Sequence, residues 1–213
     1  MLPLMAEAFR LHLLRGVEAE LRLGSYRNIA GVDEVGRGCL AGPVVAAAVI
    51  VDPDRLVPGV DDSKRVGPQD RERLAAAIKA SSLAWRVASV SADEIDRSNI
   101  LRATRKAMTE ALGSLQPAPD CAVIDAVALD DLSFPTLGMV RGDSLSYAVA
   151  CASIVAKVCR DRLMTKLAPR YPGYGWDHNM GYGTTEHRDA LERLGATPHH
   201  RQTFLGLQYG LDL

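Results

Sequence analysis

Apolar residues recur with helical spacing in some parts of the chain and form continuous runs in others. Residues 3–22 carry them every three or four positions with charges between, which predicts one amphipathic helix. The runs "IAGVD" (29–33) and "PVVAAAVIV" (43–51) predict two strands joined by the glycine-rich segment "EVGRGCLAG". A third strand is expected at "LAWRVASVSA" (83–92).

Helical patterns alternate with the remaining strands. Helices are expected over 67–80, which has a proline near its start, and over 100–115, where apolar residues recur every three or four positions. "CAVIDA" (121–126) and "TLGMV" (136–140) predict two more strands. Three consecutive strands, followed by strands that alternate with helices, predict a mixed α/β sheet flanked by helices.

The last third of the chain changes in character. Residues 145–159 are small or apolar nearly all round, so this helix should be buried closely against the sheet. A final helix is expected from Thr184 or Thr185 to Leu194. From about Ala168 the chain is rich in Gly, Tyr and His, which suggests an appended subdomain.

Composition favours a soluble, cytoplasmic protein. With 47% apolar and 24% charged residues, the chain can bury a core as one domain or as one domain with an appendage. The apolar amino-terminal stretch is interrupted by Glu7, Arg10 and Arg15, so it reaches neither translocation nor membrane-spanning length. The cysteines form no CxxC pair and are expected to be buried free thiols: Cys39, Cys121, Cys151 and Cys159.

Candidate chemistry comes from acidic residues at or just beyond predicted strand ends, which are Asp33, Glu34, Asp125 and Asp143. Carboxylates gathered at one edge repel one another unless they are protonated or bridged by hard cations such as Mg²⁺ or Mn²⁺. Two such ions can support in-line phosphodiester displacement. Taken singly, each acid is better explained as a turn residue. The net charge of −1 also requires any nucleic-acid contact to be local or assisted by metal.

The sequence around these acids favours a shared site over four separate turn residues. The chain contains, in order, "GVDEVGRGCLAGPVVAAAVI", "DDSK", "VIDA", "RGDSLSYAVACASIVAKVCRD" and "GYGTTEH...HHR..F". This series resembles the ribonuclease HII family from Ile29 to Phe204. The resemblance implies an α/β, ribonuclease H-like fold: a five-stranded mixed sheet flanked by helices, with a helical carboxyl-terminal extension. It implies a catalytic domain over 1–167, with an amino-terminal helix within 1–27, and an extension over 168–213 that contributes to substrate binding.

By the same resemblance, the four acids match the family's catalytic, metal-binding residues: Asp33, Glu34, Asp125 and Asp143. Two Mn²⁺ or Mg²⁺ ions are expected during catalysis. The third acid is commonly followed by glycine in this family, whereas Ala126 follows Asp125 here, so Asp130 or Asp131 is kept as an alternative ligand. Arg141 stands where the family usually has Lys, which keeps the charge.

Substrate contacts are expected from a glycine-rich loop, a lysine and a tyrosine. Gly36, Arg37 and Gly38 would let main-chain groups approach a ribose 2′-hydroxyl, although a plain hairpin turn is the alternative. By resemblance they form the GRG motif that senses this hydroxyl. Tyr182 matches the tyrosine that packs on the deoxyribose 3′ to the cut, or else anchors a loop. Lys64 would reach a phosphate, or be merely solvated.

We assign no catalytic role to the other polar residues near these motifs. Arg160 and Asp161 are expected to end the buried helix as a structural ion pair that braces the site. A cluster near the end of the chain either caps the surface or lines the substrate path: His187, His199, His200 and Arg201.

The implied activity is that of an endonuclease that hydrolyses the RNA strand of RNA/DNA hybrids and cuts 5′ to ribonucleotides embedded in duplex DNA. It would leave 5′-phosphate and 3′-hydroxyl ends and serve in ribonucleotide and RNA primer removal. Two alternatives are a hybrid-binding module without catalysis and a sister ribonuclease H that acts on long hybrids only. A monomer is expected. The tail "QYGLDL" (208–213) loosely matches a bacterial sliding-clamp peptide pattern, so a weak clamp contact is a further hypothesis.

Overall fold

The computed structural model describes residues 2–125, 127–129 and 132–209. Within these residues a five-stranded mixed sheet has the strand order β3-β2-β1-β4-β5. The first three strands form an antiparallel group, and β4 and β5 continue from β1 in parallel. The sheet confirms the predicted fold class and strand positions: β1 (Ile29–Val35), β2 (Val44–Ile50), β3 (Ala84–Val90), β4 (Cys121–Asp125) and β5 (Thr136–Met139).

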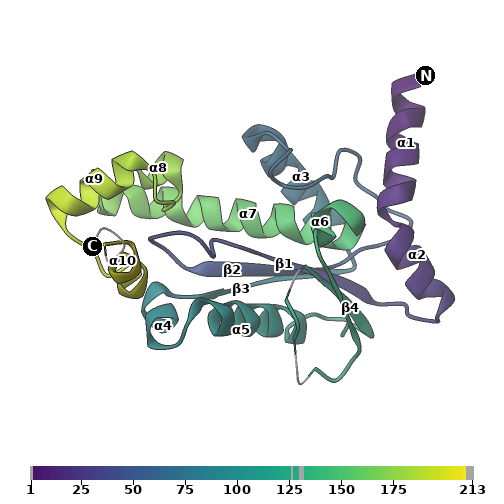
Figure 1. The fold of residues 1–213 in the computed structure, drawn as a ribbon. Coiled ribbons are helices and arrows are strands. Elements are labelled where there is room, and N and C mark those ends of the chain that lie inside the picture. Colours follow the sequence, from purple (N-terminus) through teal and green to yellow (C-terminus); the bar gives the residue numbers. More distant parts are fainter. Residues whose placement is uncertain (1, 126, 130–131, 210–213) are drawn as a thin grey trace.

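Helices cover both faces of this sheet (Figure 1). On one face lie α3 (Pro68–Ser81) and the long α7 (Tyr147–Leu167), and on the other lie α4 (Ala92–Arg97) and α5 (Ile100–Gly113). Each face has its own apolar core, because side chains alternate between faces along a strand. On β2, for example, Val49 packs toward α7.

Helix α7 approaches β1 very closely, as its small residues predict. A Cβ atom added at Gly31 would stand 2.1 Å from the backbone carbon of Ala148 and 2.3 Å from the nitrogen of Val149. The absence of a side chain at Gly31 therefore allows the two backbones to meet. Because β1 carries Asp33 and Glu34, this contact also fixes the acidic end of the strand relative to α7.

The amino-terminal segment forms two helices, so the prediction of a single helix over 3–22 was wrong. Helix α1 (Leu2–Leu14) ends before Arg15, which has φ −87° and ψ 8°, and α2 (Gly16–Leu23) starts in a new direction. The break lets the two helices reach different cores. In α2 the buried Glu18 accepts a hydrogen bond from the backbone nitrogen of Ala148, 2.8 Å away, and so caps α7.

The helix predicted over 145–159 is longer than expected, and another helix precedes it. Helix α6 (Gly142–Leu145) comes first, and α7 continues beyond residue 159 to Leu167. Its extra two turns leave the sheet and pack against the extension, so polar residues there do not end the helix.

The carboxyl-terminal extension contains three α-helices in its described part, rather than ending with the predicted one. These are α8 (Trp176–Asn179), α9 (Thr185–Leu194) and α10 (Gln202–Tyr209), after a short 3₁₀ turn η1 (Ala168–Arg170). The predicted start of α9 is confirmed, since the Thr184 side chain caps it. A third core joins this extension to the loop after β1 through Leu40 and Ala41.

The cysteine prediction holds for three thiols and fails for one. Cys39, Cys121 and Cys151 are buried and free, but the free thiol Cys159 is only half-buried, and the Lys79 Nζ atom donates to its Sγ atom at 3.5 Å. Among the described residues, no helix has both the length and the apolar character needed to cross a membrane.

Candidate active site

A cleft of 550 Å³ lies at the end of β1 and β4. It gathers three of the four predicted acids with the predicted glycine loop, lysine and tyrosine. Its lining residues are Asp33, Glu34, Val35, Gly36, Arg37, Gly38, Ser63, Lys64, Arg71, Asp125, Ser153, Lys157 and Tyr182. Segments that are far apart in the sequence therefore meet at one site.

Strand pairing brings Asp33 and Asp125 together. In the parallel ladder between β1 and β4, Val32 stands opposite Ile124, so the two aspartates follow at equivalent positions on neighbouring strands. Residues at equivalent positions of paired strands point to the same face. Asp125 is held by the backbone nitrogen of Gly142, which donates to its Oδ1 atom at 2.7 Å.

The electrostatics of the cleft disfavour the charged form of its carboxylates when no cation is bound. Burial raises the pKa of Asp33 well above its ordinary value, and the charges of Glu34 and Asp125 raise it further. Burial also raises the pKa of Glu34, against the opposing effect of Arg37, whose Nη1 atom lies 3.1 Å from Glu34 Oε1. The site thus concentrates negative charge where water cannot fully screen it.

Asp143 lies next to this cleft rather than among its lining residues. It is buried in the first turn of α6, and its pKa is raised first by burial and then by the charge of Asp62. The Lys64 Nζ atom lies 3.8 Å from Asp143 Oδ2, so the exposed lysine pairs with this acid at the rim. The charge of Asp125 also raises the pKa of Asp143, so the fourth acid interacts electrostatically with an acid of the cleft.

The donor set fits divalent cations, although the acids are not gathered tightly. The described residues contain no group of three or more His, Cys, Asp or Glu side chains close enough to hold a metal ion together. The Glu34 Oε2 atom, however, is buried without a hydrogen-bond partner in the described structure. An orphaned carboxylate oxygen beside Asp33 and Asp125 matches the all-oxygen ligands that Mg²⁺ and Mn²⁺ prefer. The alternative ligands Asp130 and Asp131 lie outside the described residues.

The glycine-rich loop connects β1 to β2 over residues 36–43. Gly36 is buried with φ +93°, where a Cβ atom would stand 2.2 Å from Arg160 Nε. Arg37 and Gly38 are exposed on the cleft side. The connection is longer than a tight hairpin turn, and it presents backbone to the cleft.

Tyr182 reaches the cleft from the extension. An isolated β-bridge joins it to Cys39 of the glycine loop. The side chain is 40% exposed, and the Lys157 Nζ atom lies 5.8 Å from its ring centre. Burial of its hydroxyl side raises the pKa of Tyr182 to about 12, so the phenol is neutral at physiological pH.

A buried histidine pair fixes the backbone of Tyr182. The Thr197 nitrogen donates to His200 Nδ1 at 2.9 Å, so His200 carries its proton on Nε2 and donates to His187 Nε2 at 3.0 Å. His187 then donates from Nδ1 to the Tyr182 carbonyl oxygen at 2.9 Å, and Trp176 Nε1 donates to the same His187 Nε2. These histidines are therefore internal supports, not surface caps.

The sequence interpretation missed several residues that line the cleft. Ser153 and Lys157 are four residues apart on the cleft side of α7, and Ser153 donates to Ser63 Oγ at 2.7 Å. Their spacing on an otherwise apolar helix was the available signal. Arg71 reaches the cleft from α3 and donates to the Ser63 carbonyl oxygen at 2.8 Å.

The predicted ion pair between Arg160 and Asp161 does not form. Asp161 pairs with Lys157, whose Nζ lies 2.8 Å from Asp161 Oδ1, because residues four apart share a helix face. Neighbouring residues on a helix point in different directions, and Arg160 instead turns inward to backbone carbonyls of the glycine loop and of Met180.

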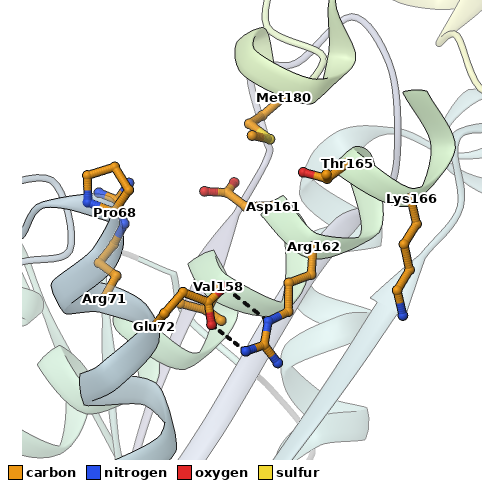
Figure 2. A pocket seen from close by; sticks show the side chains of 9 residues that line it. All are labelled: Pro68, Arg71, Glu72, Val158, Asp161, Arg162, Thr165, Lys166 and Met180. Carbon is orange, nitrogen blue, oxygen red and sulfur yellow. Dashed lines mark hydrogen bonds and ion pairs between the residues drawn. The ribbon is translucent and has the colours of Figure 1, made fainter. Parts of the chain in front are cut away.

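A second hollow, of 590 Å³, lies beside the cleft between α3 and α7 (Figure 2). Arg71 lines both spaces. The acids of this second hollow already have cationic partners, since Glu72 is bound by Arg162 and Asp161 by Lys157. Each acid of this hollow thus has a cationic partner, whereas in the cleft no ion pair is formed by Asp33 or Asp125 among the described residues.

Comparison with known proteins gives a consistent result. Residues 30–207 match the protein family described as Ribonuclease HII. The Ribonuclease HII of Geobacillus kaustophilus is 50% identical over 88% of this chain and 72% of the relative, and that of Ruegeria pomeroyi is 51% identical over 88% and 80%. Among solved structures, the ribonuclease HII of the PCNA:RNase HII complex from Archaeoglobus fulgidus superposes with a TM-score of 0.71 at 28% identity, covering 83% of this chain and 94% of that one.

Proposed function

Because this chain belongs to the ribonuclease HII family, whose members are hydrolases that act as endonucleases on RNA/DNA hybrids, we propose that it also cuts duplex DNA 5′ to embedded ribonucleotides. The products would be 5′-phosphate and 3′-hydroxyl ends. Its role would be the removal of ribonucleotides and RNA primers from DNA. The observation that carries the proposal is the meeting of Asp33, Glu34 and Asp125 with the Gly36–Gly38 loop and Tyr182 in one cleft.

Asp33, Glu34, Asp125 and Asp143 would hold two divalent cations, Mg²⁺ or Mn²⁺. When bound, such ions supply an activated water and stabilise the leaving oxygen of the phosphodiester. The protein's part is to hold the carboxylates in place: Gly142 orients Asp125, and Arg37 orients Glu34. The orphaned Glu34 oxygen and the mutual repulsion of the acids support this assignment.

Substrate recognition would fall to the other lining residues. The Gly36–Gly38 backbone would contact the ribose 2′-hydroxyl, and the half-exposed Tyr182 ring would pack on the following deoxyribose. Lys64 would release Asp143 to metal and contact a phosphate. We assign residues 1–167 to the catalytic domain and 168–213 to a substrate-binding extension, since Tyr182 enters the cleft from there.

The choice of third acid has a direct test. Asp125→Asn should abolish cleavage of an RNA/DNA hybrid, whereas Asp130→Asn should retain it, because Asp125 lines the cleft beside Asp33. Full activity of the Asp125 variant, or full wild-type activity in EDTA, would refute the carboxylate and metal assignment.

The clamp contact of residues 208–213 stays a prediction, because their side chains lie outside the described structure. The Archaeoglobus fulgidus relative was solved as a complex with PCNA, a likeness that motivates the test. Deleting residues 208–213 should weaken binding to a bacterial sliding clamp, and an unchanged affinity would remove the hypothesis.

A further inference from the structure

Two arginines are buried completely beneath the glycine-rich loop. Arg160 comes from α7 and Arg201 from the segment just before α10, and both are 0% exposed. In the described part of the chain neither guanidinium forms an ion pair, and all their hydrogen bonds go to backbone carbonyl oxygens. Burial of an unpaired cation is costly, so stability alone does not account for this arrangement.

The carbonyls that these arginines bind come mostly from one loop. Arg201 donates to Gly36 at 2.6 Å, to Arg37 at 2.8 Å and to Gly42 at 3.0 Å. Arg160 donates to the carbonyls on either side of Gly42, those of Ala41 and Pro43, at 3.0 Å each. The two side chains therefore fix both ends of the 36–43 connection with its carbonyl oxygens pointing inward.

Inward carbonyls determine where the amides point. In a planar trans peptide the N–H group points opposite to the preceding C=O group. With the carbonyls of Gly36 and Arg37 bound to Arg201, the N–H groups of Arg37 and Gly38 must point away from it. Within the described structure neither N–H has a hydrogen-bond acceptor, and both residues are exposed on the cleft. Two consecutive free donors form a concave site suited to a hydroxyl or phosphate oxygen.

We propose that Arg160 and Arg201 are positioning residues for ribose recognition, which hold the amides of Arg37 and Gly38 toward the substrate's 2′-oxygen. This inference rests on the proposed function, because it assumes that the Gly36–Gly38 loop contacts the ribose. It also explains why residues from the extension belong to the site: Arg201 is the link between the extension and the loop. Two unneutralised cations below the loop further give a protein of net charge −1 a local positive field.

The test compares binding of two duplexes that differ by a single ribonucleotide, measured by fluorescence anisotropy in EDTA so that neither is cut. Arg201→Lys and Arg160→Lys keep the charge but lose the planar fork that binds several carbonyls. Each should reduce the preference for the ribonucleotide duplex about tenfold while leaving affinity for the all-DNA duplex near the wild-type value. Arg162→Lys, an exposed residue of α7 paired with Glu72, is the matched control and should keep the preference.

The outcomes separate the possible failures. If folded Arg160→Lys and Arg201→Lys proteins keep the wild-type preference, the positioning role is wrong. Equal loss of affinity for both duplexes would also overturn it, because that is the result of a merely structural role. If one variant fails to fold by circular dichroism, the other decides. If the wild type itself shows no preference for the ribonucleotide, the ribose contact of the proposed function fails instead.

Discussion

At Asp33 a carboxylate is buried beside Glu34 and Asp125, and both neighbours add negative charge. We expect this side chain to destabilise the metal-free fold at neutral pH. Its charged form is removed from water, it has no ion-pair partner among the described residues, and the hydrogen bond from the Glu34 nitrogen offsets only part of the cost. Such a residue is retained for binding or chemistry rather than for stability. The free-energy cost of burying the Asp33 carboxylate should therefore be measurable.

Asp33→Asn is expected to abolish hydrolysis while raising the stability of the metal-free protein by about 1 kcal/mol. The pKa of Asp33 is raised in the folded state, so the wild-type penalty is present at pH values above that pKa and disappears as the carboxyl is protonated at low pH. Urea unfolding in EDTA at several pH values measures the free energy of unfolding of both proteins. Asp54→Asn, at an exposed turn, is the control, and a destabilised Asp33→Asn protein would contradict the account.

For single residues, the sequence motifs identified three acids, the Gly36–Gly38 loop, Lys64 and Tyr182, and the structure brings them together in the cleft. They did not identify Ser153, Lys157 or Arg71, which also line it. The sequence could not show that Asp143 lies beside the cleft, or that Lys64 pairs with it, because both depend on tertiary placement of α6. Nor could it show that Arg160 and Arg201 bind carbonyls, since a charged residue in a sequence carries no sign of its partner.

The packing of α7 on β1 leads to a prediction at the level of elements. Gly31→Ala should lower the free energy of unfolding by about 2 kcal/mol, because the added Cβ atom would overlap backbone atoms of Ala148 and Val149. Chemical denaturation measures the change. At Gly113, at the end of α5, a Cβ atom meets nothing within 4 Å, so Gly113→Ala is the control. Equal stability of the two variants would refute the close contact.

The histidine pair that supports Tyr182 predicts a pH dependence of the extension. Burial and the nearby His187 lower the pKa of His200 to about 4 in the folded protein. As the pH falls through 6.5, this histidine is therefore protonated in the unfolded chain while it stays neutral in the folded protein. Stability from neutral His200 is present above pH 6.5, and about 2 kcal/mol should be lost between pH 7 and pH 5. Urea unfolding should show a smaller loss in His200→Gln than in wild type. An identical loss in both proteins would contradict this role.

Elements were predicted well where periodicity was strong, and poorly where tertiary contacts set their ends. The continuous apolar runs predicted the strands, and the threonines at 184 and 185 predicted the start of α9. The break at Arg15 depends on α1 and α2 reaching different cores. The end of α7 depends on its packing with the extension, which no local pattern reveals.

For the whole molecule, the arrangement of acids predicts that divalent cations stabilise the native state. Adding Mn²⁺ at a hundredfold excess over its dissociation constant should raise wild-type stability by about 2.7 kcal/mol, because the unfolded chain has no assembled site. Thermal unfolding should show this rise for wild type and Asp54→Asn, and a much smaller one for Asp33→Asn. An equal rise in all three would place the cation elsewhere.

Fold class and sheet composition were accessible from the sequence, because strands, helices and the family motifs agreed. The way the extension reaches the catalytic cleft was not. Tyr182 and Arg201 are far from the glycine loop in sequence. Tertiary contacts bring the segments together: the β-bridges of Cys39 with Tyr182 and of Ala41 with His200, and the hydrogen bonds from Arg201 to the loop carbonyls. The cleft is therefore lined by residues of both the sheet domain and the extension, and its assembly depends on contacts between them.

The most direct test is cleavage of an end-labelled DNA duplex that contains one ribonucleotide, with Mg²⁺ or Mn²⁺ present, beside an all-RNA/DNA hybrid. The account predicts one cut, 5′ to the ribonucleotide, leaving a 3′-hydroxyl and a 5′-phosphate, and no product with Asp33→Asn. Cutting of the hybrid alone would contradict the proposed recognition of a single ribose by the Gly36–Gly38 loop and Tyr182.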